Sequence, residues 1–258
     1  MHDLAPIADF VFQHQREARE MGRLTNQWPG LTVEDAYRIQ ALVVDRMIAG
    51  GDRLVGWKMG LTSAAKQRSM GVAEPIYGRL TEGMELAEPV LPLAGTIHPR
   101  VEPEVAFVFK RALGGSAVRP RDVWLATECV LPAFEIIDSR YENFSFTLVD
   151  VVADNASGCR FYVGEQGFSP YACSWADVGV VVKKNGEVVQ AGAGAAVLGH
   201  PVRSVVILTQ MLARIGAEIE PGMVVLTGGI TEAVHLAAGD RVDIVFDQLG
   251  TIPLRVTP

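Results

Sequence analysis

The sequence lacks the features that mark nucleic-acid-binding and membrane proteins. Lys and Arg number 23 against 30 Asp and Glu, a formal net charge of −7, and the basic residues form no run. A nucleic-acid surface needs clustered positive charge, so we expect no nucleic-acid partner. No uninterrupted apolar stretch reaches the ~18 residues of a membrane span, and the N-terminal "MHDLAPIADF" has no signal-peptide core. We therefore expect a cytoplasmic protein without membrane contact.

Cysteine, histidine and nucleotide-binding motifs are also sparse. The cysteines are Cys129, Cys159 and Cys173, an odd number at wide spacings, which fits small buried residues in a reducing compartment. The 5 histidines show no metal-ligand spacing. Neither a phosphate-binding loop, a dinucleotide fingerprint nor a G-x-S-x-G motif occurs. The sequence therefore gives no support to zinc, nucleotide or serine-hydrolase chemistry.

The first fifty residues carry helix signals. Thr32 is placed as an N-cap with Asp35 three residues later, a variant of the capping box, and apolar residues recur at helical spacing as far as Gly50. Glycine at the end of such a run is a common helix stop. Further helices are predicted from about Ser63 to Met70, from near Pro120, and from Pro201 to Gly216.

The remainder of the chain has the pattern of strands and turns. "VGVVVKKNGEVVQAG" predicts a hairpin at Asn185-Gly186, and "GDRVDIVFDQLGTIPLRV" a second pair of strands joined at Gly250. Strands predominate after residue 98 without regular alternation with helices, which disfavours a doubly wound parallel sheet. We expect an α+β fold in one catalytic domain over residues 1–258, with a helical part over about 1–50 and a mixed β-rich body over about 51–258.

Three glutamates lie in segments that are otherwise apolar. In "HPRVEPEVAFVF", Glu102 and Glu104 project from one face of a strand, and that face continues as Ala106 and Val108; Glu135 lies in "VLPAFEIIDSR". A Glu-x-Glu pair more often marks a solvent face. However, three buried carboxylates without partners would have to be protonated or bind a cation. Oxygen ligands favour Mg²⁺, or alternatively Mn²⁺, and three such ligands leave positions open for water or substrate.

Two glycine-rich segments could contribute to a ligand site. Lys58 lies in "GWKMGLT", where an apolar setting could aim the ammonium into a cleft toward an anionic substrate, although a lone lysine is usually solvated. "TGGIT", Thr227–Thr231, brings backbone amides and a hydroxyl into a tight turn that could hold a carboxylate.

Several long segments together resemble the hydratase/decarboxylase branch of the fumarylacetoacetate hydrolase superfamily. The likeness runs from about Leu24 to Val256. It is strongest in "GWKMGLTSAAKQRSMGVAEPIYG", "HPRVEPEVAFVF", "PAFEIIDSRYENFSFTLVDVVADNAS", "GAGAAVLGHP" and "LTGGIT". The resemblance implies a mixed β-roll fold, in agreement with the strand pattern.

The resemblance also implies roles for individual residues. It implies that Glu102, Glu104 and Glu135 bind Mg²⁺, the same three acids that the burial argument selects. Lys58 and Ser157, the serine of "ADNAS", are implied to be catalytic residues in the pocket.

Within this branch, two segments favour a carboxy-lyase. "GVAEPIYG" has Ile76 where hydratases offer an aspartate for proton transfer, and "RYENF" stands where hydratases resemble "RIxDW". The implied activity is decarboxylation of 2-oxo-3-hexenedioate (4-oxalocrotonate) in the meta-cleavage degradation of aromatic compounds. The alternatives are hydration of 2-hydroxypenta-2,4-dienoate and a non-catalytic partner subunit of such a hydratase. Hydrolysis of acylpyruvates is a further alternative, but no His–Glu dyad is evident near the N-terminus.

The substrate implied by this activity is a small-molecule 2-oxo dicarboxylate. We expect the turn of Thr227, Gly228 and Gly229 to bind its keto-acid end and Ile76 to form an apolar wall around the leaving carboxylate. Arg160 is expected to orient the distal group, with a surface ion pair as the alternative. The resemblance further implies a homo-oligomer and a complex with the hydratase of the same pathway.

Overall fold

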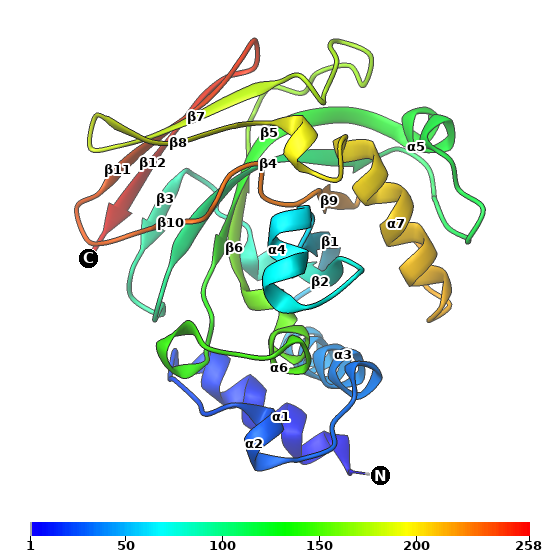
Figure 1. Cartoon of the computed structure of the whole chain (residues 1–258), viewed down its shortest axis with the longest axis vertical. Helices are drawn as coiled ribbons and strands as arrows, with labels where there is room; N and C mark the ends of the chain where they lie inside the picture. The colour runs from blue at the N-terminus through cyan, green and yellow to red at the C-terminus, as the bar shows by residue number, and fades with distance from the viewer. Residues whose placement is uncertain (1) are drawn as a thin grey trace.

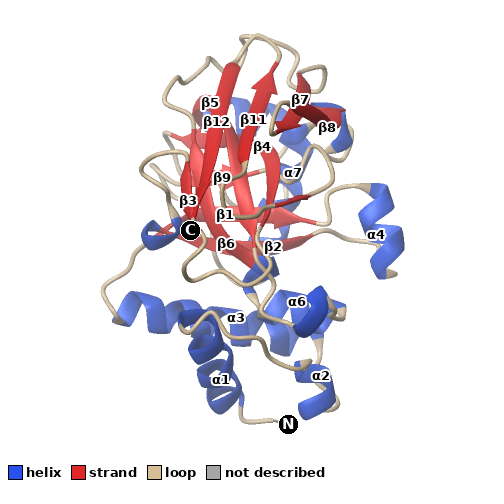
Figure 2. Cartoon of the chain, turned by 90° about the vertical axis from the view of Figure 1, so that its left-hand side faces the viewer, coloured by secondary structure: helices blue, strands red, loops and turns tan. Residues whose placement is uncertain are grey.

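The computed structural model describes residues 2–258 except the side chains of residues 66, 69 and 70. Its helices are α1 (Leu4–Arg16), α2 (Leu24–Gln27), α3 (Val33–Ala49), α4 (Ala64–Met70), α5 (Pro120–Ala126), α6 (Leu148–Ala153) and α7 (Pro201–Ala213). Short 3₁₀ turns are η1 (Glu82–Met84), η2 (Glu142–Phe144), η3 (Asn155–Ser157) and η4 (Gly194–Ala196). Helices α1, α2, α3 and α6 gather at one end of the molecule, beneath a body of strands (Figures 1 and 2). The predicted helical N-terminal part is confirmed.

Helix α3 begins and ends where its sequence predicts. The Thr32 side chain accepts a hydrogen bond from the backbone N–H of Asp35, and the Asp35 carboxylate accepts one from the N–H of Thr32, a complete capping box. Gly50 is the C-cap. Ile39 and Val43 are fully buried on the inner face and pack against α1 and α6 in a core separate from that of the sheets.

The strands are β1 (Leu54–Gly60), β2 (Ile76–Thr81), β3 (Val90–Pro92), β4 (Arg100–Phe109), β5 (Thr127–Ile137), β6 (Gly158–Val163), β7 (Gly179–Lys184), β8 (Glu187–Ala193), β9 (Val224–Leu226), β10 (Val234–His235), β11 (Arg241–Phe246) and β12 (Gly250–Thr257). One sheet has the order β2-β1-β9-β4-β5-β6, with β10 beside β4. The other has the order β3-β12-β11-β7-β8. Most pairs are antiparallel, but β1–β9 and β12–β3 are parallel. These mixed, curled sheets confirm the predicted α+β fold of the β-roll type.

The predicted hairpins form with one adjustment. Asn185 and Gly186 join β7 to β8 with φ of 54° and 90°, as a type I′ turn requires. Gly250, expected to join β11 to β12, is instead the first residue of β12 and has a φ of 98°. The chain reverses at residues 247–249, just before this glycine.

The two faces of the larger sheet have different surroundings. On β4, Val105 and Phe107 point into the main core, which also contains Leu208 of α7 and Ile244 of β11. The alternate residues of β4 point to the opposite face, so Glu104 leaves the strand away from this core. The sheet therefore has one face packed against apolar side chains and one that carries the carboxylates.

Residues 194–213 are long and apolar enough to cross a membrane by composition alone, but half of that stretch is buried inside the protein. It includes α7, whose Val205, Leu208 and Leu212 are fully buried in the core. His200 caps this helix by accepting a hydrogen bond from the N–H of Val202. We therefore assign α7 as a core helix.

Candidate active site

The strand pair β4–β5 brings the predicted acids together. In this antiparallel pair Glu102 lies opposite Glu135, and Glu104 lies opposite Ala133, so all three glutamates share one face. One carboxylate oxygen from each lies within 4.8 Å of the others. Glu102 is 7% exposed, and Glu104 and Glu135 are fully buried. The cluster is therefore compact and sheltered from solvent, at the spacing that a single cation could bridge.

Burial of these acids destabilises their charged forms. The pKa of Glu104 is raised well above its usual range, first by burial and then by the charges of Glu135 and Glu102. The charge of Lys58 and the hydrogen bond from the N–H of Gly228 lower the pKa of Glu104, but they do not outweigh these effects. Oε1 of Glu104 is buried and has no hydrogen-bond partner among the described residues. A set of three carboxylates with an open buried oxygen fits a hard divalent cation such as Mg²⁺.

Lys58 lies on β1 and makes a buried ion pair with the cluster. Its Nζ is 2.8 Å from Oε2 of Glu135 and donates to the carbonyl oxygen of Ala156 at 2.9 Å. Both charged side chains are at most 2% exposed. The buried acids therefore do have protein partners, and that of Glu135 is a cation. Lys58 lies beside the acids, and its ion-pair partner is a protein carboxylate rather than a ligand.

The glycine turn after β9 supports the acids. The N–H of Gly228 donates to Oε2 of Glu104 at 2.6 Å, and the hydroxyl of Thr227 donates to the carbonyl of Val105. A Cβ on Gly229 would lie 2.8 Å from the carboxyl carbon of Glu102. This turn was expected to bind the substrate, and its contacts within the described chain include those with the acids and with β4. Gly229 is needed because the carboxylate of Glu102 approaches the backbone so closely, and Gly228 because its φ is 112° and the Thr62 side chain leaves no room for a Cβ.

We predict that Gly229→Ala lowers Mg²⁺ affinity about 10- to 100-fold, the usual effect of disturbing groups that orient metal ligands. The added methyl would push the carboxylate of Glu102 out of the cluster. Isothermal titration with Mg²⁺ measures this effect. Gly22→Ala is the control because its Cβ would meet only Gln27 Nε2, at 3.6 Å. Equal affinity in Gly229→Ala and Gly22→Ala would contradict the assigned role.

A left-handed turn precedes β6. Asn155, Ala156 and Ser157 have φ of 51°, 51° and 59°. This conformation costs roughly 1–2 kcal/mol for each residue other than glycine, so the surrounding structure must hold it. Ser157 is buried, and its hydroxyl oxygen has no hydrogen-bond partner among the described residues. The predicted catalytic serine therefore lies in a strained, sheltered turn whose preceding carbonyl contacts Lys58.

The N-terminal end of this turn is anchored by two side chains, those of Asp154 and Asn155. The carboxylate of Asp154 accepts from Nε of Arg140 at 2.7 Å, and Nη2 of Arg140 donates to the carbonyl of Asp154. The side-chain amide of Asn155 donates to the carbonyl of Arg79 and accepts from its N–H. Asp154 and Asn155 are buried. Rigid attachment to β2 and to the loop after β5 is what sustains the left-handed backbone.

Ile76, predicted to form an apolar wall, lies close to Lys58 in the sheet. It begins β2 opposite Gly60 of β1, on the same sheet face as Lys58, and it is 5% exposed. A Cβ on Gly60 would lie 3.1 Å from Cγ1 of Ile76 and 3.9 Å from the methyl of Ala156. Ile76 therefore closes the lysine side of the site with hydrocarbon and supplies no acid or base.

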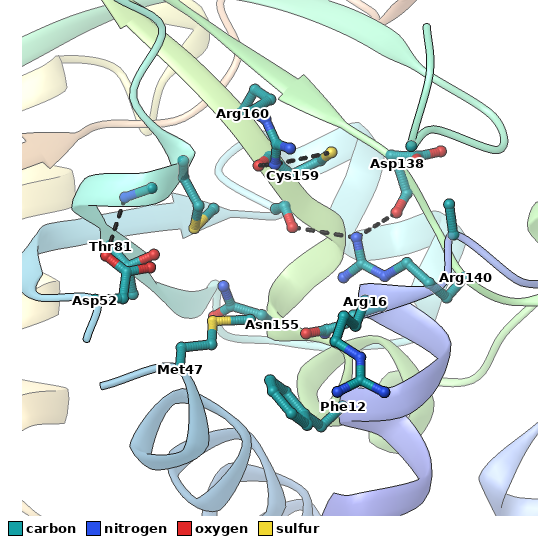
Figure 3. A pocket seen from close by; sticks show the side chains of 16 residues that line it. Phe12, Arg16, Met47, Asp52, Thr81, Asp138, Arg140, Asn155, Cys159 and Arg160 are labelled. Atoms are coloured by element: carbon teal, nitrogen blue, oxygen red, sulfur yellow. Dashed lines mark hydrogen bonds between the residues drawn. The ribbon is translucent and has the colours of Figure 1, made fainter. Parts of the chain in front are cut away.

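Arg160 is not brought to the carboxylates. It alternates along β6 with Phe161, the partner of Glu135, so its side chain leaves the opposite face. Its guanidinium donates to the carbonyl of Cys159, and it lines a cavity of about 310 Å³ together with Asp138 and Arg140 (Figure 3). The expected contact with the distal substrate group therefore has no support in this geometry, nor does a surface ion pair, since no carboxylate contact of Arg160 is present in the described chain.

Several supporting residues were not identified from the sequence. Asn155 and Asp154 were visible only as part of the quoted "ADNAS" segment, and Gly78 and Arg79 were not singled out. Asparagine is the non-glycine residue best suited to a left-handed turn, which is a signal that could have identified Asn155. The contact of its side chain with β2 depends on tertiary structure and has no local signal.

Comparisons with known proteins agree with this architecture. The family described as Fumarylacetoacetate (FAA) hydrolase C-terminal matches residues 87–257. The chain is 43% identical over 250 residues to a 4-oxalocrotonate decarboxylase of Pseudomonas sp. (strain CF600), covering 96% of this chain and 95% of that protein. It is 39% identical over 250 residues to a 2-hydroxyhexa-2,4-dienoate hydratase of Comamonas testosteroni, with coverages of 96% and 95%.

A solved structure gives the same result. The 4-oxalocrotonate decarboxylase from Pseudomonas putida G7, complexed with magnesium and adipate, superimposes with a TM-score of 0.95 at 42% identity. The match covers 98% of this chain and 97% of that chain. The chain therefore belongs to the fumarylacetoacetate hydrolase family.

Proposed function

We propose that this protein is a Mg²⁺-dependent carboxy-lyase that converts 4-oxalocrotonate (2-oxo-3-hexenedioate) to 2-hydroxypenta-2,4-dienoate and CO₂. The observation that carries the proposal is the buried cluster of Glu102, Glu104 and Glu135, with oxygens within 4.8 Å of one another and Lys58 beside it. Adipate, the ligand of the similar solved structure, is a dicarboxylate of the same chain length as this substrate. The relatives named 4-oxalocrotonate decarboxylase support the same choice.

We propose that Glu102, Glu104 and Glu135 hold Mg²⁺, with Mn²⁺ as an alternative. When bound, the ion would supply a Lewis acid that draws electrons toward the keto oxygen of the substrate. The Glu104 carboxylate is fixed for this role by the N–H of Gly228, and Glu135 by Lys58. The protein thereby prepares ligands whose orientation is set before the metal and the substrate arrive.

The chain's own residues then define the reaction. The bond to the distal carboxylate breaks, its electron pair moves through the conjugated double bond to the keto oxygen, and CO₂ leaves. The enolate oxygen so formed then takes one proton, ultimately from water, to give 2-hydroxypenta-2,4-dienoate. Lys58 has three N–H donors, and its contacts with Glu135 and Ala156 engage two of them, so the third can stabilise developing negative charge on the substrate. Ser157 would hydrogen-bond the keto-acid end.

Ile76 favours decarboxylation over hydration. An apolar wall disfavours a charged carboxylate and favours neutral CO₂ as the product. Hydration would instead need a group that delivers a proton to the substrate. Ile76 is buried and cannot supply one.

We propose further that the protein works in the cytoplasm, in the meta-cleavage degradation of aromatic compounds. The names of the decarboxylase and hydratase relatives support the pathway. A homo-oligomer, and a complex with the pathway hydratase that consumes the dienoate product, are part of the proposal. A second function, hydration of 2-hydroxypenta-2,4-dienoate, is kept as the alternative because hydratase relatives match nearly the full chain.

Parallel assays on the two substrates test the proposal. We expect stoichiometric CO₂ release from 4-oxalocrotonate, abolished by exhaustive chelation and restored by Mg²⁺ or Mn²⁺. Full activity in chelator would remove the metal from the mechanism. Consumption of 2-hydroxypenta-2,4-dienoate without CO₂ release would make the protein a hydratase. Inactivity on both substrates, combined with activation of a separate hydratase, would make it a non-catalytic subunit.

A further inference from the structure

The left-handed turn before β6 is fixed to the strand beside Lys58. Oδ1 of Asn155 accepts from the backbone N–H of Arg79 at 2.8 Å, and Nδ2 donates to the carbonyl of Arg79 at 2.9 Å. Arg79 follows Gly78, which pairs with Lys58 across β1 and β2. One side-chain amide therefore fastens the turn to β2 at two points, within one residue of the partner of the lysine.

The turn in its anchored position contacts the lysine directly. The residue after Asn155 is Ala156, whose carbonyl accepts from Nζ of Lys58 at 2.9 Å. A Cβ on Gly78 would lie 2.8 Å from the carbonyl oxygen of Asn155 and 3.0 Å from Cδ of Lys58. The turn, the strand and the stem of the lysine are therefore in mutual contact, and a shift of the turn would move the acceptor of the ammonium.

The backbone conformation makes this anchoring necessary. Three consecutive residues of the turn have positive φ, and none of them is glycine. Without restraint such a segment would relax toward right-handed or extended conformations. Relaxation would withdraw the carbonyl of Ala156 from Lys58 and shift the hydroxyl of Ser157. The amide of Asn155 both suits a left-handed backbone and supplies the restraint.

We infer that Asn155 is a positioning residue for the reaction. Its amide holds the carbonyl of Ala156 against Lys58, so that the ammonium stays between Glu135 and the substrate instead of turning toward Glu135 alone. The inference rests on the proposed function. Among the described residues Asn155 makes no hydrogen bond with the three glutamates, in this scheme it does not touch the substrate, and it acts through the turn.

Two substitutions separate positioning from stability. Asn155→Ala and Asn155→Gly both remove the clamp, but glycine adopts the left-handed conformation without strain. We expect both variants to lose about 10- to 100-fold in kcat, the effect of misplacing a catalytic group. KM should change less than about threefold, and Asn155→Gly should melt at a higher temperature than Asn155→Ala. Recovery of wild-type kcat in Asn155→Gly would overturn the inference.

Gln40→Ala provides a matched control. Gln40 is a fully buried amide that also bridges two backbone segments, donating to the carbonyls of Tyr77 and Val152 at 3.1 and 2.9 Å. Its carbonyl accepts from the side chain of Arg79, and among the described residues it makes no hydrogen bond with the left-handed turn. We expect Gln40→Ala to destabilise the protein at least as much as Asn155→Ala while kcat stays within about twofold. An equal loss of kcat in both would mean that activity merely follows stability, which would overturn the inference.

A crystal structure of Asn155→Ala and a Mg²⁺ titration of the same variant test the positioning role of Asn155 without any measurement of activity. We expect Nζ of Lys58 to move by about 1 Å or more from the carbonyl of Ala156, the scale of misplacement that affects rate, while Mg²⁺ affinity changes less than about twofold. An unmoved Lys58 would overturn the inference. Absence of CO₂ release by the wild-type protein would instead refute the proposed function. The position of Lys58 in the variant crystal structure would then still test whether Asn155 positions the lysine.

Discussion

Glu104→Gln is expected to lower kcat/KM for 4-oxalocrotonate by about 10²- to 10⁴-fold and to remove its dependence on Mg²⁺, because the metal's contribution of several kcal/mol is lost. The protein should remain folded. The amide keeps the size of the carboxylate, and its oxygen can still accept from the N–H of Gly228. Steady-state CO₂ release across a Mg²⁺ series measures the effect. Wild-type rates from this variant would show that the acids are only structural.

The same variant should be more stable than the wild type when metal is absent. Burial and neighbouring acids raise the pKa of Glu104, so the folded state keeps a proton that the unfolded chain loses above its own, ordinary pKa. Metal-free wild-type protein therefore loses stability as the pH rises from the unfolded pKa toward the raised folded pKa. Glu104→Gln has no carboxyl group at this position and so lacks this pH dependence. The difference in stability between the variant and the metal-free wild type should therefore grow as the pH rises between the two pKa values of Glu104.

Thermal unfolding across pH, with and without Mg²⁺, measures this difference. Saturating Mg²⁺ should reverse the order, since the ion binds the folded wild type and offsets the charge of its acids. Glu128→Gln is the control, because Glu128 lies on the neighbouring strand β5, which also carries Glu135, but is exposed, with a weak contact of 3.7 Å to Lys110. The same crossover in Glu128→Gln would contradict the assignment to the cluster.

The parts of this site that were predictable are those with local signals. Two glutamates in one strand, two residues apart, must share a face, and the apolar continuation of that face indicated burial. The capping box of Thr32 and Asp35 and the turn at Asn185-Gly186 are likewise local, and both form as expected. The third acid, Glu135, could be placed beside Glu102 only by the resemblance, because strand register is not written in either segment.

The contacts that hold the site together could not be derived in this way. Lys58 meets Glu135 only because β1 and β5 lie in one sheet, separated by β9 and β4. The hydrogen bond from the N–H of Gly228 to Glu104 likewise depends on packing between segments that are distant in the sequence. Arg160 was misplaced because one extra residue at a bulge in β6, between the partners of Ile136 and Ile137, makes the parity of that strand unpredictable from sequence.

Lys58→Met is expected to lower both stability and rate. Removing one partner of a buried ion pair costs about 3–5 kcal/mol. Here the negative charge of Glu135 would also repel Glu102 and Glu104 more strongly, because the ammonium no longer offsets it. Loss of a donor to developing negative charge should lower kcat by about 10²- to 10³-fold. Denaturant unfolding of the metal-free protein and steady-state CO₂ release measure the two effects.

Saturating Mg²⁺ separates the two roles of this lysine. A bound cation compensates the charge of Glu135 in place of the ammonium, so most of the lost stability should return. The rate should not return, because methionine has no donor for the substrate. If Mg²⁺ restored kcat as well, Lys58 would serve only to neutralise Glu135. If neither stability nor rate responded to Mg²⁺, the lysine would be needed to assemble the metal site itself. The assignment of two separate roles to Lys58, compensating the charge of Glu135 and contacting the substrate, would then be wrong.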